Sequence, residues 1–289
     1  MGKYYKIVPK LYESINVGYY PNNKIFFGFI MTINNKLFTV LSVILSILLS
    51  SNILFAEQYN TVDKKVIIEL KNQVQENPKN AQKRYLLGRA YLKNNNIKSA
   101  EKELKKALKL DGKDTSILLE YGGLLLQKRD YKKLYDLLLN TSFDEKNKES
   151  ESKRLVIIAL AYLQEGKLSE AKNTVSQAKK VKNTAGVQLA LAKMAFFESD
   201  YKTTEKIISQ LLLQSVDDYD VLFLKARLAN QLGQYKKAQA IYKKLLSQNP
   251  GNPFLIVSLA QTKYDLKQYK SAEADINAIL KHKNGFPGF

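Results

Sequence analysis

The chain has 289 residues, of which 45% are hydrophobic and 25% are charged, and this composition excludes a disordered or fibrous protein. It contains no cysteine, which excludes disulfides, thiolate catalysis, cysteine-ligated metals and lipid attachment through an N-terminal cysteine. Its one histidine, His282, leaves no histidine pair for a metal site or a proton relay. The formal charge is +19, but the lysines are spread along the chain, which argues against a nucleic-acid partner.

The first 30 residues are rich in tyrosine and asparagine and show no amphipathic period. A second methionine, Met31, stands six residues before an uncharged run and begins a short basic leader. We interpret residues 1–30 as an upstream extension produced by a misassigned start. The alternative is a short cytoplasmic tail ahead of a membrane anchor.

Residues 31–56 have the order of a secretory signal: a basic residue, an apolar run and a small residue. The run Leu37–Phe55 carries no charge, follows Lys36 and precedes Ala56, after which we expect cleavage. Cleavage after Ser51 is an alternative, as is retention of the run as an inner-membrane anchor, because it is long enough to span a bilayer. We therefore expect an exported protein that is either released outside the cytoplasm or anchored with the rest of the chain outside it.

Residues 57–80 are predicted to be a linker and a capping helix near Thr61–Glu76. From there a period of about 34 residues fills the chain, with six repeats over residues 81–284. Small residues recur at one position of each repeat: Gly88, Gly122, Ala159, Ala192, Ala226 and Ala260. Bulky residues recur where a second helix of each repeat should begin: Ile97, Tyr131, Leu168, Tyr201, Tyr235 and Tyr269. Apolar residues recur at spacings of three and four, so each repeat is predicted to be a helix pair.

This pattern resembles the tetratricopeptide repeat, most clearly in YLLGRAYLKNNNIKSAEKELKKALKLD (Tyr85–Asp111) and LGQYKKAQAIYKKLLSQNP (Leu232–Pro250). The resemblance implies an all-α fold, a right-handed superhelix of about six helix pairs. The small residues fit this fold because helices that cross closely leave no room for a large side chain. The polar run Phe143–Ser152 carries the extra residues between the second and third repeats. Residues 285–289 are expected to be a truncated linker or a tail that packs on the last pair.

The resemblance also implies a binding surface, since in this family the first helix of each pair lines a concave channel that holds segments of partner proteins. The residues that the alignment places on this channel are Tyr85, Arg89, Leu126, Leu160, Lys193, Phe196, Phe223, Arg227, Asn230 and Tyr264. An apolar channel with Arg89, Lys193 and Arg227 suits an amphipathic or extended partner segment with some negative charge. The alternative is that some of these side chains only pack one repeat against the next.

The sequence shows no catalytic arrangement, and we expect neither an enzyme nor a cofactor or small-molecule substrate. No glycine-rich phosphate loop is present, the serines lack a histidine to activate them, and Asp217–Asp218 is explained as a helix N-cap. Four glutamates beside lysines on second helices are expected on solvated faces: Glu101, Glu103, Glu170 and Glu273.

Among exported repeat proteins, the stretch GRAYLKNNNIKSAEKELKKALKLD is similar to the repeat proteins that accompany exosortase and PEP-CTERM sorting systems. That resemblance implies a scaffold in envelope assembly, in protein sorting or in biofilm formation. It also implies a location in the periplasm of a Gram-negative bacterium, or anchored in the membrane and facing the periplasm. The alternative is an exopolysaccharide-secretion component that bridges an outer-membrane porin, and a third option is a cytoplasmic adaptor.

Overall fold

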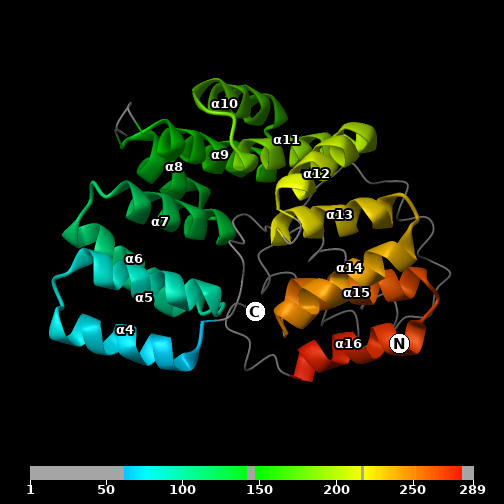
Figure 1. The fold of residues 1–289 in the computed structure, drawn as a ribbon, viewed down its shortest axis with the longest axis horizontal. Helices are drawn as coiled ribbons and strands as arrows, with labels where there is room; N and C mark the ends of the chain where they lie inside the picture. Colours follow the sequence, from blue (N-terminus) through cyan, green and yellow to red (C-terminus); the bar gives the residue numbers. More distant parts are fainter. Residues whose placement is uncertain (1–61, 142–146, 216–217, 251, 282–289) are drawn as a thin grey trace, which may run out of the picture. The chain divides into compact units, whose positions relative to one another are not determined.

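The computed structural model describes residues 62–141, 147–215, 218–250 and 252–281, which form thirteen α-helices and no strand (Figure 1). The helices are α4 (Lys64–Glu76), α5 (Ala81–Lys93), α6 (Ile97–Leu110), α7 (Thr115–Gln127), α8 (Tyr131–Leu139), α9 (Lys148–Gln164), α10 (Leu168–Val181), α11 (Ala185–Phe197), α12 (Tyr201–Gln214), α13 (Tyr219–Gln231), α14 (Tyr235–Gln248), α15 (Pro253–Asp265) and α16 (Tyr269–Lys281). The predicted extension, the signal or anchor run, His282 and the C-terminal tail lie outside the described residues.

The helices form two compact units. The first unit holds α4 to α13, in which α5 and α6, α7 and α8, α9 and α10, and α11 and α12 are antiparallel pairs. The second unit holds α14 to α16, with α15 and α16 as its pair. The all-α, helix-pair fold predicted from the 34-residue period is confirmed.

The second helix of every repeat begins at the bulky residue that the spacing predicts, from Ile97 in α6 to Tyr269 in α16. In the turn before each of these helices, one residue has a positive φ, two positions before the first residue of the helix. These residues are Asn95, Arg129, Gly166, Ser199, Gly233 and Lys267. The turns share a backbone hydrogen bond that closes over six residues, as from the N–H of Asn96 to the carbonyl of Tyr91, 2.8 Å. This is a Schellman ending, which satisfies the last carbonyls of the first helix and reverses the chain.

Short polar side chains begin each first helix. The residues that accept a hydrogen bond from the first turn are Asn80, Asp114, Asn147, Thr184, Asp218 and Asn252. Such N-caps satisfy backbone donors that have no partner within the helix. The N-cap role predicted for Asp218 is confirmed, with 2.9 Å between its carboxylate and the N–H of Val221.

Helix crossings occur at the recurring small residues. A Cβ atom added to Gly88 would lie 2.8 Å from Cγ of Leu104, and one added to Gly122 would lie 2.9 Å from Cδ1 of Leu138. Both leucines are fully buried, so the second helix seats a large side chain where the first helix has none. Thr204 on α12 is also fully buried, and its hydroxyl donates to the carbonyl of Asp200, 2.8 Å.

One expectation about polar residues is wrong. Glu103 is buried rather than solvated, because the guanidinium of Arg84 on α5 reaches its carboxylate at 2.7 Å. Within the run Phe143–Ser152, which carries the extra residues, α9 begins at Lys148, and Ser152 is fully buried, its hydroxyl donating to the carbonyl of Lys182, 2.9 Å. Helical pairing therefore extends one turn further towards the N-terminus in this repeat than in the others.

The helix expected near Thr61–Glu76 corresponds to α4, which packs against α5. Its start is held in place by Asn94 of the α5–α6 turn, whose side-chain amide donates to the carbonyl of Val62 and accepts from its N–H, at 2.9 and 2.7 Å. Gln73 and Glu69 are hydrogen-bonded to each other on this helix.

Candidate partner-binding face

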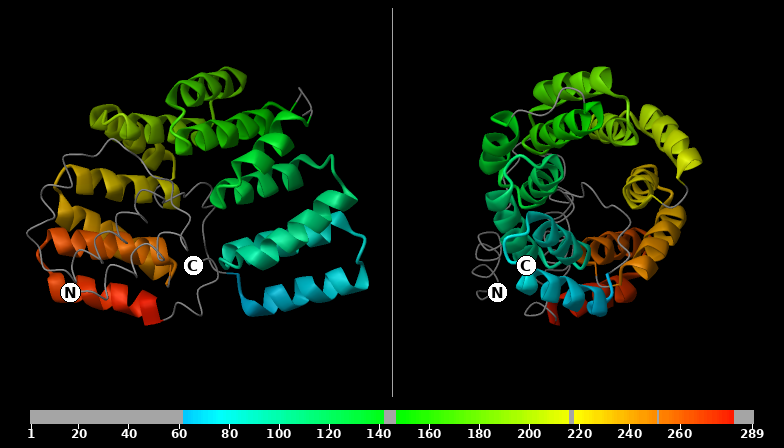
Figure 2. Two further views of the ribbon diagram at one scale, coloured as in Figure 1. Left: turned by 180° about the vertical axis from the view of Figure 1, so that it is seen from behind. Right: turned by 60° about the vertical axis from the view of Figure 1, so that its left-hand side comes forward.

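The first helices line the inner side of the curved row of helices in the first unit. Figure 2 shows this for α9 and α13, with α10 and α12 on the outer side. On each first helix three positions, four and three residues apart, follow one face, as Tyr85, Arg89 and Leu92 do on α5. These are the positions that are predicted from the sequence to line the binding channel.

The first of the three positions is used for packing between repeats. Its occupants Tyr85, Leu119, Val156, Phe223 and Val257 are buried, and Leu189 is partly buried. At the second and third positions the exposure of the side chain differs from repeat to repeat. Leu126 and Leu160, in the middle of the first unit, are buried, whereas the other residues at these positions are partly exposed. Of the ten predicted site residues, those with partly exposed side chains are Arg89, Lys193, Phe196, Arg227, Asn230 and Tyr264.

Arg89 on α5 contacts the neighbouring first helix. Its Nε lies 3.5 Å from Oε2 of Glu120 on α7, and its guanidinium lies 5.6 Å from the ring centre of Tyr85. Both members of the ion pair are partly buried. The cation at this end of the face is therefore already opposed by a carboxylate of the same protein.

Lys193 on α11 and Arg227 on α13 each contact a residue of the other helix. Nζ of Lys193 lies 4.0 Å from Oδ1 of Asp220, with 16% and 7% of the two side chains exposed. The guanidinium of Arg227 lies 4.7 Å from the ring centre of Phe196, a cation–π contact. Burial lowers the pKa of Lys193, and the nearby charge of Asp220 opposes that shift.

Sequence reasoning missed both carboxylates, although a periodic signal for them exists. Glu120 lies three residues before Gly123, the counterpart of Arg89 in the next repeat, and Asp220 lies seven residues before Arg227, the counterpart of Lys193. Three and seven residues are close to one and two helical turns, so each carboxylate is on the inner face of the following first helix. Each carboxylate follows its cation along the chain by one repeat length minus three or minus seven residues. A search for acidic residues at these two distances after each cation would have found them.

Tyr264, the predicted site residue of the second unit, lies near Tyr269 at a ring-centre distance of 5.1 Å. Burial raises the pKa of its phenol. Beside it, burial also raises the pKa of the Asp265 carboxyl, although the amide of Gln261 donates to that carboxyl at 3.1 Å. This part of the face is aromatic and polar with one carboxylate.

In the described ranges no group of three or more histidine, cysteine, aspartate or glutamate residues is placed to hold a metal ion. None of the helices in those ranges is both long enough and apolar enough to cross a membrane.

Two family models match the chain. The model described as the tetratricopeptide-repeat domain of cytochrome c-type biogenesis protein H matches residues 64–182, and a general tetratricopeptide-repeat model matches residues 229–287. No curated protein matches the chain significantly.

Solved structures with similar folds are numerous. A tetratricopeptide-repeat protein from Parabacteroides merdae is 20% identical with a TM-score of 0.51, covering 78% of this chain and 90% of that one. Two further structures are similar, each with 12% sequence identity and a TM-score of 0.55: the Cut9–Hcn1 hetero-tetramer of the APC/C and the human IFIT1 dimer with m7Gppp-AAAA. The matches cover 86% and 75% of this chain but only 50% and 55% of those chains. At these identities the likeness concerns the fold alone.

Helix pairs that cross at small residues and repeat every 34 residues or so define an α-solenoid, a class of scaffold that supports protein–protein interaction. Together with the two family models, the crossing residues and turns identify the chain as a tetratricopeptide-repeat protein.

Proposed function

We propose that this protein is a non-enzymatic scaffold of the bacterial cell envelope that binds a segment of a partner protein along the inner face of α4 to α13. The observation that carries the proposal is the patch of Phe196, Arg227 and Asn230 on neighbouring first helices. All three side chains are partly exposed, and the cation–π contact orients the first two. Aromatic and arginine side chains contribute most of the binding energy in many protein interfaces.

The charges on this face favour an amphipathic partner over a purely acidic one. Two of the three predicted cations, Arg89 and Lys193, face a carboxylate of the protein itself, so an acidic partner has to compete with Glu120 or Asp220. Apolar contacts with Phe196 and with the partly buried Leu163 do not meet such competition. A partner helix or extended segment would then bind through apolar residues, and its negative charges would adjust orientation and association rate.

The envelope location rests on the sequence. The run Leu37–Phe55 after Lys36 has the composition of an export signal or anchor. The match over residues 64–182 to a domain named for cytochrome c biogenesis supports a role in the assembly of exported proteins. We include PEP-CTERM protein sorting in this proposal, because sorting is also a step in the assembly of exported proteins. A reporter enzyme that works only outside the cytoplasm, fused after Ala56, should be active, and activity of a cytoplasm-only reporter at the same position would contradict the export.

Site-specific photocrosslinking tests the binding face. A photoreactive phenylalanine analogue is placed in the full chain at Asn230, which is partly exposed at the third of the three positions on α13. The matched control places it at Lys225, an exposed residue on another side of the same helix. We expect irradiation of cells to crosslink a defined partner peptide at Asn230 and not at Lys225. Equal crosslinking at both sites, or crosslinking only at Lys225, would place the interface elsewhere.

Replacing Phe196 by alanine provides an independent readout of the same interface. Loss of the ring should speed dissociation of the crosslinked partner by about tenfold or more, because aromatic anchors act mainly on the dissociation rate. Unchanged dissociation would remove Phe196 from the interface.

A further inference from the structure

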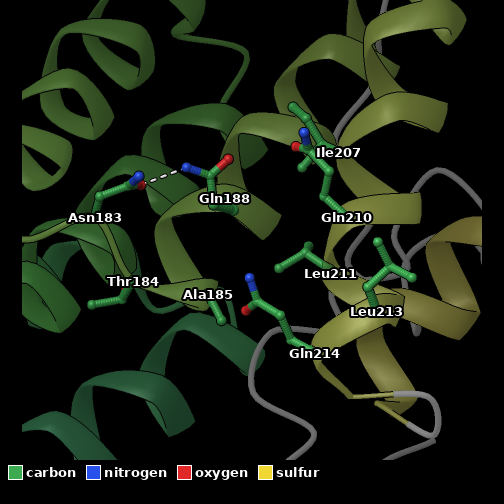
Figure 3. A pocket seen from close by; sticks show the side chains of 9 residues that line it. All are labelled: Asn183, Thr184, Ala185, Gln188, Ile207, Gln210, Leu211, Leu213 and Gln214. Atoms are coloured by element: carbon green, nitrogen blue, oxygen red, sulfur yellow. Dashed lines mark hydrogen bonds between the residues drawn. The ribbon is translucent and has the colours of Figure 1, made fainter.

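A pocket of about 440 Å³ lies where the start of α11 meets the end of α12 (Figure 3). Its volume is within the range of natural ligand sites. The lining residues are Asn183, Thr184, Ala185, Gln188, Ile207, Gln210, Leu211, Leu213 and Gln214. All belong to the first unit.

None of the nine lining residues is charged, in a chain of which a quarter of the residues are charged. The polar groups are four carboxamides and one hydroxyl. The pocket therefore has no charged lining group to select phosphates, carboxylates or nucleic acids, although the whole chain is strongly basic. Its ligand should be uncharged.

The carboxamides stand on opposite sides of the pocket. Figure 3 shows Asn183 and Gln188 on one side, joined by a hydrogen bond, and Gln210 and Gln214 on the α12 side, with Leu211 between these two glutamines. The side chains of Gln210 and Gln214 make no hydrogen bond to other described residues. Each carboxamide both donates and accepts, which matches the N–H and C=O of a peptide group.

The apolar part of the lining is aliphatic. Leu213 is 87% exposed, the largest exposed fraction among the large hydrophobic residues of the described part of the chain. Ile207 and Leu211 lie near it in the same lining. No aromatic ring is present in the lining, whereas carbohydrate sites usually stack sugar faces on such rings. Aliphatic side chains of a peptide fit these surfaces better than a sugar does.

We propose that this pocket binds an extended, uncharged polypeptide segment, whose backbone pairs with the carboxamides of Gln210, Gln214 and Gln188 and whose aliphatic side chain lies on Leu213. None of the lining residues is one of the predicted inner-face residues, so the protein would hold two segments at once, or one partner at two points. Two weak contacts on one partner strengthen each other through their high effective concentration.

The test uses the full chain and a fluorescently labelled heptapeptide, acetylated and amidated, in which threonine alternates with leucine. Fluorescence anisotropy should show saturable binding. The double variant Gln210→Glu/Gln214→Glu keeps the side-chain size but removes the N–H donors, and it should bind about tenfold more weakly, the effect of losing two ordinary hydrogen bonds. Leu213→Ser should also weaken binding, and because Leu213 is exposed the fold should be kept.

Three controls establish whether the peptide binds at this pocket and through its backbone. Gln82→Glu adds a negative charge at an exposed glutamine of α5 and should leave binding unchanged. A heptapeptide with N-methylated leucine amides lacks backbone donors and should bind at least tenfold more weakly. Asn230→Ala on the inner face should have no effect, so failure of this site and failure of the inner-face proposal are distinguishable. Equal binding by wild type and the double variant, absence of saturable binding, or displacement of the peptide by maltose would each overturn the proposal.

Discussion

Replacing Lys193 by methionine tests whether the Lys193–Asp220 pair couples α11 to α13. At the observed 4.0 Å, two unit charges attract by about 4 kcal/mol at an effective dielectric constant of about 20. Burial of the lysine, which lowers its pKa, offsets part of that attraction. Removing one member leaves the other charge in a site where only 7% or 16% of the side chain is exposed. We therefore expect Lys193→Met to lower the free energy of unfolding by about 3 kcal/mol.

The double-mutant cycle gives the decisive comparison. Asp220→Asn should cost a similar amount, whereas the pair Lys193→Met/Asp220→Asn should lie within about 1 kcal/mol of wild type, because neither charge is then left behind. Urea unfolding followed by circular dichroism measures the stability. Amide hydrogen exchange in α11 and α13 measures the local effect, since a chain with two units need not unfold in one transition. Single effects below about 1 kcal/mol, or effects that simply add, would show that packing alone joins these helices.

Three further predictions concern the repeat scaffold and its charges. Gly88→Ala should lower the free energy of unfolding by about 1–3 kcal/mol, because its Cβ would lie 2.8 Å from the buried Leu104. The control Gly112→Ala should change the free energy of unfolding by less than about 0.5 kcal/mol. Equal melting temperatures of the two variants would refute the crossing geometry. Gly233→Ala should cost about 1 kcal/mol through its φ of +71° alone, since no atom lies within 4 Å of the new Cβ, and urea titration measures this. Burial would raise the pKa of Glu101, but hydrogen bonds from two lysines outweigh burial and lower it. The stability that ionised Glu101 contributes to the fold is therefore present above its ordinary pKa of 4.5 and is lost as the pH falls through the lowered pKa. Glu101→Gln should therefore cost at most about 1 kcal/mol at pH 7 and progressively less as the pH falls, and a cost that does not decrease in acid would rule out the ion pairs as its cause.

The helix pairs could be predicted from the sequence because their packing is local. The two helices of one repeat are joined by a short turn, so a small residue such as Gly88 and a bulky residue such as Leu104 must meet at a fixed spacing. The same spacing repeats, which is why Tyr131 and Tyr201 could be recognised as starts of second helices. Local turn chemistry, helical period and the position of the crossing residue all indicate the same structure.

The state of the inner face was decided only by tertiary structure. Leu126 and Phe196 occupy the same repeat position, yet one is fully buried and the other is partly exposed. The burial of Glu103 likewise depends on the guanidinium of Arg84 from the preceding helix, and the inner-face cation of Lys193 meets a carboxylate from the next repeat. Exposure at these positions depends on how each repeat is rotated and shifted on its neighbour, which follows from the side chains of both. The period of one sequence therefore determines which residues can face the channel, and the packing of consecutive repeats determines which of them remain open to a partner.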